Sequence, residues 1–286
     1  MSYLITGASG QLGHEWVQYA KREGIPYRAL SHEELDITKS ELVEMLLERI
    51  KPKVLINCAA YTNVDGAESE RELAFSVNRD GVINLANASA TLGIKMVHYS
   101  TDYIFSGSSE DRIKFARGYP EDAPKHPVNV YGESKVAGES ALTQSGADYL
   151  LLRVSWLCGR FGSNFVKTML GLGAKRNSLQ VVDDQLSSPS FTDQVTEQTN
   201  RLLSDGAAGT YHLSSKGMIS WADYATEIFN LSGFQINVER ISSEEYGFEA
   251  ERPKYSLLST AKAESEGVEI IEWRSGLKNL LKQIGI

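Results

Sequence analysis

The feature that most constrains the fold is a glycine-rich turn directly after the first apolar run of the chain. The apolar run is Tyr3–Thr6, the turn is residues 7–13 (GASGQLG), and an amphipathic segment at 11–23 follows. Glycines at this spacing allow a tight turn from strand to helix and let a diphosphate approach the N–H groups at the helix N-terminus. Such a turn can also join a strand to a helix without binding a ligand. Here the turn directly follows a strand and begins a helix, which is the context that a dinucleotide-binding motif requires. The expected contacts are Gly7, Gly10, Gln11 and Leu12.

Apolar strands and amphipathic helices alternate through the first half of the chain. Further strands are expected at 27–30, 54–56, 96–100 and 149–154, and helices at 40–50, 70–92 and 134–143. Strands joined by helices of this length form a parallel sheet covered on both faces. The expected fold class is α/β, a Rossmann-like doubly wound parallel sheet. The stretch 107–127, rich in glycine, proline and charge, is interpreted as a surface excursion inside this domain.

The second half is less regular and indicates a smaller C-terminal α/β substrate lobe. Helices are expected near 164–172, 192–204, 221–232 and 276–283, and strands near 179–182 and 210–213. We divide the chain into an NAD(P)-binding Rossmann domain at 1–150 and a mainly substrate-binding lobe at 151–286. Some segments of this lobe are expected to return to the Rossmann core.

Composition excludes several classes of partner. The 286 residues include 29 Lys and Arg against 37 Asp and Glu, a formal net charge of −8, which disfavours nucleic acid as a partner. No stretch approaches the ~18 apolar residues that cross a bilayer, so no membrane association is expected. Two cysteines are too few for a disulfide framework, and the first residues lack the pattern of an export signal. We therefore expect a cytoplasmic protein with reduced thiols.

The position that selects between NAD and NADP carries no carboxylate. An NAD site places an acidic residue about 20 residues after the glycines, where it binds the ribose 2′-hydroxyl. Ser31 and His32 stand there instead, which favours NADPH, with NADH as a tolerated alternative. Asp36 is a candidate adenine contact or, equally, a turn or helix-cap residue. Ala59 and Ala60 follow the third strand with small side chains that would let a cofactor lie against the backbone.

A tyrosine and a lysine four residues apart, Tyr131 and Lys135, supply the candidate chemical centre. On a helix this spacing places both side chains on one face. Tyrosine has an unperturbed pKa of about 10, and a nearby ammonium would lower that pKa toward the working range. Thr101 directly follows a strand, at the sheet edge where ligands bind, and could hydrogen-bond a substrate carbonyl. These three residues are the predicted acid–base centre.

Taken in chain order, these segments resemble the extended short-chain dehydrogenase/reductase superfamily, whose Ser/Thr–Tyr–Lys triad matches Thr101, Tyr131 and Lys135. Within that superfamily the chain is similar to the family of dTDP-4-dehydrorhamnose reductases. The segments that carry this resemblance span nearly the whole chain: GQLG at 10–13, LDIT at 35–38, AAYTNVD at 59–65, AE at 67–68, YSTDYIF at 99–105, NVYG at 129–132, SW at 155–156, NFVKTML at 164–170 and RP at 252–253.

The resemblance implies an NADPH-dependent oxidoreductase that reduces the C4 ketone of a nucleotide-activated deoxysugar, in dTDP-rhamnose and polysaccharide biosynthesis. By the same resemblance, Lys135 would bind the nicotinamide ribose, Tyr131 would protonate the C4 oxygen, and Thr101 would orient the carbonyl. The implied substrate contacts are Thr62, Val64, Tyr103, Trp156, Asn164 and Arg252.

Several alternatives stay open at this point. Trp156 could be a core aromatic, and Asp65 and Glu68 could simply start a helix. The sugar could differ, or the chain could be a non-catalytic NADP-binding regulatory subunit resembling that of methionine adenosyltransferase, although the intact triad favours an enzyme. Some relatives dimerise through a magnesium site, for which Glu15 is available, but we expect no essential metal. The expected assembly is a monomer or a homodimer.

Overall fold

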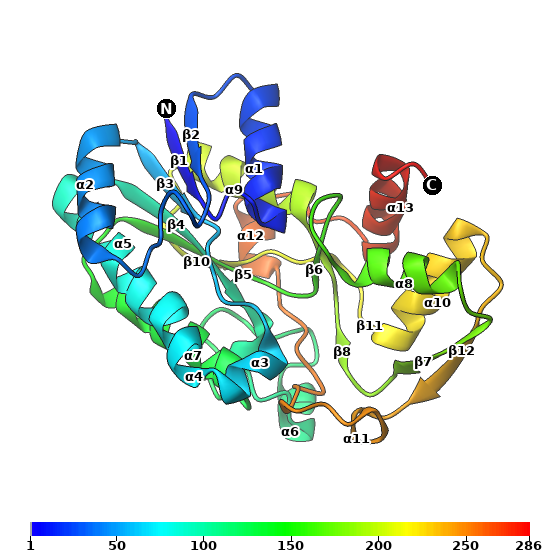
Figure 1. Cartoon of the computed structure of the whole chain (residues 1–286). Helices are drawn as coiled ribbons and strands as arrows, with labels where there is room; N and C mark the ends of the chain where they lie inside the picture. Colours follow the sequence, from blue (N-terminus) through cyan, green and yellow to red (C-terminus); the bar gives the residue numbers. More distant parts are fainter. Residues whose placement is uncertain (1) are drawn as a thin grey trace.

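The computed structural model describes residues 2–286. Five strands from the first half of the chain and one from the second half form a six-stranded parallel sheet, and this sheet with its covering helices is called the first unit (Figure 1). The strands are β1 (Tyr3–Thr6), β2 (Tyr27–Leu30), β3 (Val54–Asn57), β4 (Lys95–Thr101), β5 (Tyr149–Val154) and β10 (Gly209–His212). Their order is β10-β5-β4-β3-β1-β2, so the direction of winding reverses between β1 and β3. This topology confirms the Rossmann-like doubly wound fold that the alternating pattern predicts.

Helices cover both faces of the sheet. One face carries α2 (Ser40–Ile50), α5 (Gly81–Leu92) and α7 (Val130–Gln144), and the other carries α1 (Gln11–Arg22) and α9 (Thr192–Ser204). Because both faces are covered, the central strands are continuous apolar runs, and such runs are visible in the sequence. β10 and α9 come from the second half of the chain but lie in this first unit.

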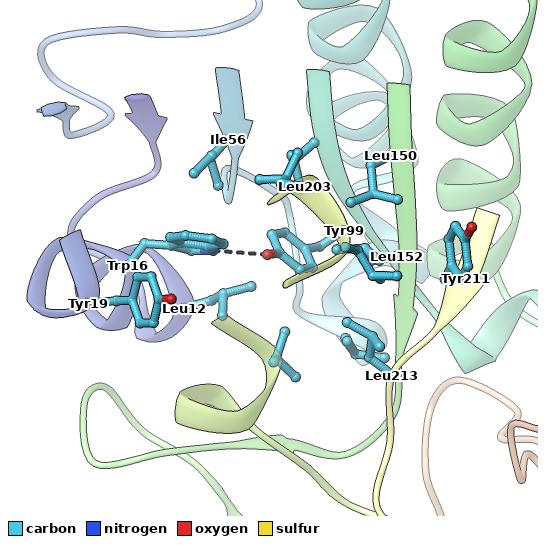
Figure 2. Packing of buried hydrophobic residues seen from close by; sticks show 14 of the residues in the cluster. Leu12, Trp16, Tyr19, Ile56, Tyr99, Leu150, Leu152, Leu203, Tyr211 and Leu213 are labelled. Carbon is cyan, nitrogen blue, oxygen red and sulfur yellow. Dashed lines mark hydrogen bonds between the residues drawn. The ribbon is translucent and has the colours of Figure 1, made fainter. Parts of the chain in front are cut away.

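Figure 2 shows the core between the sheet and helices α1 and α9. Alternate strand residues enter opposite cores: Tyr3 and Ile5 of β1 belong to this one, whereas Leu4 belongs to the core on the other face. Trp16 of α1 is fully buried, and its indole N–H donates to the Tyr99 hydroxyl at 2.9 Å. The helix that begins at the glycine turn is thereby fixed against β4.

The single helix expected at 70–92 is interrupted. It consists of α4 (Arg71–Phe75), a π-helical turn η1 (Ser76–Asp80) and α5, and the short helix α3 (Val64–Ser69) precedes it. A π turn inserts an extra residue and redirects a side chain. Here Asn78 reaches two other segments, because its Nδ2 donates to the Tyr61 carbonyl at 3.0 Å and to the Ser134 hydroxyl at 2.9 Å. These hydrogen bonds are tertiary, so periodicity does not reveal the interruption.

α7 begins at Val130, earlier than the residue 134 expected from the sequence. Asn129 caps the helix by accepting the Gly132 N–H at 2.7 Å, and the Glu68 carboxylate accepts the Val130 N–H at 2.9 Å. Glu68 therefore supports α7 as well as lying in α3. As a result, Tyr131 lies in the first turn of α7.

The second lobe has its own apolar core, formed by α8 (Phe165–Gly173), α10 (Trp221–Ser232) and α13 (Trp273–Gln283). Its strands pair two by two: β7 (Ser178–Val182) with β12 (Asn237–Ile241), β6 (Leu157–Cys158) with β9 (Ser190–Phe191), and β8 (Leu186–Ser187) with β11 (Ile219–Ser220). The remaining short helices are η2 (Asp102–Ile104), α6 (Ser109–Lys114), α11 (Ser243–Tyr246) and α12 (Ala261–Ser265). Two-residue strands and the mostly exposed β12 have no apolar periodicity, so the sequence did not predict them.

Within residues 2–286, no helix combines the length and the apolar character needed to span a membrane.

Candidate active site

A cavity of about 590 Å³ opens at the carboxyl ends of β3, β4 and β5, beside the glycine turn that follows β1. Open α/β sheets bind ligands at this edge, where the strand order reverses. The predicted residues that line the cavity are Gly10, Gln11, Leu12, Ala59, Ala60, Thr62, Val64, Thr101, Tyr103, Tyr131, Lys135 and Trp156. The predicted residues outside its lining are Gly7, Ser31, Asp36, Asn164 and Arg252.

The glycine turn forms a cradle at the N-terminus of α1. Gly7 has a φ of +60°, and a Cβ there would lie 2.6 Å from the backbone nitrogen of Ala59. A Cβ on Gly13 would lie 2.2 Å from the Gly7 carbonyl oxygen, so both glycines are needed for close packing. Gly10 lines the cavity, and it has no side chain to fill the space before the first N–H groups of the helix. The residues present therefore fit a diphosphate-containing cofactor.

Gln11 in this turn is held by the second lobe. Its Nε2 donates to the Leu157 carbonyl at 3.1 Å, and its Oε1 accepts from Asn164 Nδ2 at 2.7 Å. Asn164 also caps α8 by accepting the Lys167 N–H at 3.2 Å. The structure thus places Asn164 as a helix cap and a support for Gln11, outside the cavity in which a substrate contact was expected.

The two residues predicted at the adenosine end of the cofactor site, Asp36 and Ser31, both make hydrogen bonds within their own local segments. Asp36 closes a turn, because its Oδ1 accepts the Thr38 N–H at 3.0 Å and the Thr38 hydroxyl at 2.7 Å. These hydrogen bonds show Asp36 as a turn residue, and its contact with adenine stays a prediction. Ser31 lies just after β2 as expected, but its N–H donates to the Glu34 carboxylate at 2.9 Å, and its hydrogen bond lowers the pKa of Glu33. Two carboxylates that the prediction did not consider therefore flank Ser31.

The three predicted catalytic residues share one wall of the cavity. Thr101 ends β4, Tyr131 and Lys135 lie one turn apart on α7, and all three residues line the cavity. Lys135 is 2% exposed, and its Nζ donates to the Tyr99 carbonyl at 2.7 Å. The wall therefore presents a phenol, a hydroxyl and an ammonium to one space.

The pKa of Tyr131 is raised rather than lowered. Burial raises it to about 12, against the opposing influence of the Thr101 side chain, and the charge of Asp102 adds to the rise. Burial lowers the pKa of Lys135 to about 8, against the opposing influence of Glu139. Lys135 is not among the groups that shift the pKa of Tyr131, and its ammonium donates to the Tyr99 carbonyl. Tyr131 is therefore protonated at neutral pH and suited to donate a proton.

Asp102 is a neighbour of the triad that the sequence argument did not select. Its carboxylate accepts from the Thr101 hydroxyl at 3.1 Å and from the Ser256 hydroxyl at 2.5 Å. Burial raises the pKa of Asp102 to about 7, although both hydrogen bonds oppose that rise. The strand-end motif STDY contains this aspartate, so its position next to Thr101 was a usable signal.

An aromatic wall separates this cavity from a second one. Trp156 has a φ of +45°, rare for a residue with a side chain, and its ring stacks on Trp221 with centroids 3.6 Å apart. Strained backbone of this kind clusters at functional sites, and Trp156 lines the cavity, so the structure favours a site role over a purely core one. The Trp221 indole N–H donates to Gln185 at 3.1 Å. Trp221 was missed because in the sequence it is only the first residue of a helix.

The second cavity, of about 910 Å³, lies in the second lobe between α8, β7, β12 and the segment around Phe248. Tyr103 and Trp221 line both cavities, so the two adjoin. Arg252 lines this second cavity rather than the first. A ligand that reaches Tyr131 and also fills the second cavity would have to be long.

Arg252 is fixed by a bidentate ion pair with Asp65. Its two terminal nitrogens lie 2.9 and 2.8 Å from the two carboxylate oxygens, and the same carboxylate accepts the Ala250 N–H at 3.1 Å. The Arg252 guanidinium also lies 3.8 Å from the Phe248 ring centroid. Asp65 therefore does more than start α3, because it ties the second-lobe segment to the first unit.

Glu15, considered above as a magnesium ligand, is buried and paired with Arg160. The shorter of the two contacts, from the Arg160 guanidinium to Glu15 Oε1, is 2.8 Å, and Thr192 adds a hydroxyl contact at 3.3 Å. Across residues 2–286, no group of three or more His, Cys, Asp or Glu side chains is arranged to hold a metal ion. Glu15 thus acts as a link between α1 and the second half of the chain.

Comparisons with known proteins agree with this geometry. The family model described as the RmlD substrate binding domain matches residues 1–286. The chain is 37% identical to the Bacillus subtilis spore coat polysaccharide biosynthesis protein SpsK, covering 98% of this chain and 96% of that protein. It is 36% identical to the dTDP-4-dehydrorhamnose reductase of Sinorhizobium fredii, covering 98% and 97%. The crystal structure of Bacillus anthracis dTDP-4-dehydrorhamnose reductase in complex with NADP superposes with a TM-score of 0.94 at 38% identity, covering 99% of each chain. The chain therefore belongs to the RmlD substrate-binding-domain family, the family of the dTDP-4-dehydrorhamnose reductases.

Proposed function

We propose that the chain is an NADPH-dependent oxidoreductase that reduces the C4 ketone of dTDP-4-dehydro-β-L-rhamnose to give dTDP-L-rhamnose. The observation that carries this proposal is the wall on which Thr101, Tyr131 and Lys135 meet beside the glycine cradle. Family membership, with dTDP-4-dehydrorhamnose reductases similar over nearly the whole chain, supports this reaction and this sugar. The NADP complex of the similar Bacillus anthracis enzyme supports the choice of cofactor.

NADPH would be held by the cradle and by the small residues after β3. Gly10, Gln11 and Leu12 would meet its diphosphate, and Ala59 and Ala60 would let it lie along the sheet edge. When bound, NADPH supplies the hydride. Ser31 is the residue proposed to meet the 2′-phosphate, with NADH accepted less well. Lys135 would bind the nicotinamide ribose through its ammonium.

The remaining chemistry belongs to the chain's own side chains. Thr101 would orient the C4 carbonyl by a hydrogen bond from its hydroxyl, and Tyr131 would donate the phenolic proton to the developing alkoxide. The raised pKa of Tyr131, about 12, keeps that proton in place until the oxygen becomes basic.

The adjoining cavities suit a nucleotide sugar. The sugar would lie near Thr62, Val64 and Tyr103 against the Trp156 ring. The nucleotide would extend past the aromatic wall into the second cavity, where Arg252 offers a cation to the diphosphate. Such a substrate is anionic although the chain has a net charge of −8, so its binding depends on local groups rather than on the overall field.

The assay that tests this proposal follows NADPH absorbance at 340 nm with the dTDP-4-keto-6-deoxy-L-sugar, in wild type and in Tyr131→Phe. We expect wild-type turnover and a loss of about 100-fold or more in kcat for the variant, the usual contribution of a general acid. Unchanged turnover in Tyr131→Phe would rule out its role as the acid. Turnover only with a different dTDP-ketosugar would show that the enzyme catalyses the same class of reaction on another sugar. Tight NADPH binding without turnover of any such sugar would favour a non-catalytic subunit.

A further inference from the structure

A buried ion network lies beside Lys135, and the chemistry described above does not use it. Glu139 lies one turn further along α7 and is fully buried. Both of its carboxylate oxygens accept from the Arg153 guanidinium, each at 2.9 Å. Lys125, from the segment before α7, lies 2.7 Å from one of the same oxygens. Two cations therefore share one carboxylate inside the protein.

Among the charged groups near Lys135, the Glu139 carboxylate is the one that favours the protonated ammonium. On β4, burial lowers the pKa of His98 far below its usual value, and on β10 burial lowers that of His212 to about 3, so both rings are neutral. Glu139 is the group whose charge favours the protonated form of Lys135. The other titratable groups on the elements packed against α7 are Asp65, Glu68, Arg71, Glu72, Arg79, Asp80, Lys95, Tyr99, Asp102, Tyr103, Tyr149 and Arg153, with Tyr131 and Glu133 on α7 itself.

We propose that Glu139 is a positioning residue for the reduction: its buried carboxylate keeps the Lys135 ammonium charged, and Lys125 and Arg153 weaken this effect by sharing the carboxylate. The inference rests on the proposed function only in taking Lys135 as a residue that must be charged. Residues four apart on a helix are neighbours, and both side chains are buried. The carboxylate, whose direct ion pairs are with Arg153 and Lys125, therefore acts on the ammonium through the protein interior, where solvent screens little. Burial by itself favours a neutral lysine, and a nearby opposite charge restores the cation.

Removing the Glu139 carboxylate and removing the Lys125 cation should shift the pH dependence of activity in opposite directions. Burial lowers the pKa of Lys135 to about 8, so activity that needs the ammonium is present below that pH and is lost as the pH rises through it. Glu139→Gln removes the favourable charge and should move this alkaline midpoint down by about one unit or more. Lys125→Gln removes a competing cation and should move the midpoint up. If the network had a purely structural role, the two variants would not shift the midpoint in opposite directions.

The experiment measures kcat/KM from pH 6 to 10 for wild type, Glu139→Gln and Lys125→Gln. A second readout is the titration of Lys135 by NMR of protein labelled at lysine, with Lys135→Arg assigning the signal; it needs no turnover. The matched control is Lys95→Gln, which removes a paired lysine at the opposite end of β4 from Thr101 and should leave both midpoints unchanged. Lys125→Gln keeps the Arg153–Glu139 pair, so the test does not depend on the folding of Glu139→Gln.

We expect the midpoint and the NMR titration to fall in Glu139→Gln and to rise in Lys125→Gln. Shifts in the same direction, or no shift in Lys125→Gln, would overturn the proposal. An inactive wild type would count against the proposed function, whereas the NMR titration would still decide whether Glu139 controls Lys135. The two failures are therefore distinguishable.

Discussion

The ion pair between Asp65 and Arg252 predicts a specific defect in substrate binding. Asp65 on α3 holds the second-lobe segment through both terminal nitrogens of Arg252 and through the Ala250 N–H. Arg252 lines the second cavity, in which we place the nucleotide. Asp65→Asn keeps the size of the side chain but removes its charge and one of its acceptor oxygens. Arg252 would then have to be ordered when substrate binds.

The size of the effect follows from burial. Hydrogen bonds to charged groups contribute about 1.5–3 kcal/mol when shielded. The Arg252 side chain is only 12% exposed but that of Asp65 is 38% exposed, so solvent screening reduces this value to about 1–2 kcal/mol. A loss of that size corresponds to a factor of about 5–30. We therefore expect KM for the dTDP-sugar to rise by about 5–30-fold, with little change in kcat.

Steady-state kinetics with each substrate varied in turn provide the assay. KM for NADPH should stay unchanged, because Asp65 and Arg252 do not line the cofactor cavity. The control is Asp183→Asn, which removes one of the carboxylates paired with Arg240 on the surface of the second lobe. Unchanged or lower KM for the sugar in Asp65→Asn would refute the argument, since it would mean that Asp65 does not hold Arg252 in a productive place.

Three further outcomes follow from the structure. Gly7→Ala should lower the free energy of unfolding by about 2–5 kcal/mol, measured by urea denaturation, because its Cβ would meet the Ala59 nitrogen at 2.6 Å and its φ is +60°; wild-type stability would contradict the packing. Glu34→Gln should lower KM for NADPH by up to about fivefold and leave that for NADH unchanged, as expected for an exposed charge near a 2′-phosphate; an equal effect on both would place the phosphate elsewhere. The ion pair with Arg153 lowers the pKa of Glu139 to about 2, although burial opposes this. The ionised Glu139 therefore stabilises the fold fully above the usual pKa of a glutamate, and this stabilisation is lost as the pH falls through about 2. If Glu139→Gln lowers the melting temperature equally at pH 7 and at pH 2, this contribution is excluded.

The sheet, and the meeting of Thr101, Tyr131 and Lys135 at one cavity, could be predicted from the sequence for physical reasons. Strands buried on both faces are continuous apolar runs, which is why Tyr149–Val154 was found with its observed bounds. Tyr131 and Lys135 were found because four residues span about one helical turn, a spacing that holds wherever the helix begins. The Glu139–Arg153 pair joins α7 to β5, and nothing in the local sequence connects these residues.

Other features depend on how distant segments meet. Asn164 and Gln11 touch through a hydrogen bond between the lobes, so a family motif at Asn164 could not distinguish a substrate contact from a helix cap. The carboxylates beside Ser31 come from a turn whose conformation is not encoded by a motif. Trp221 belongs to the site because its ring stacks on Trp156, and only the packed second lobe brings the two together.

In the proposed reaction, hydride reaches C4 of the sugar on the wall formed by Thr101, Tyr131 and Lys135. The most direct measurement uses NADPH carrying deuterium at the transferred position of its nicotinamide and locates the label in the sugar product by NMR. We predict deuterium at C4 of dTDP-L-rhamnose, formed by wild type and almost abolished in Tyr131→Phe. Deuterium at another carbon, or an unlabelled product formed at the wild-type rate, would contradict the account.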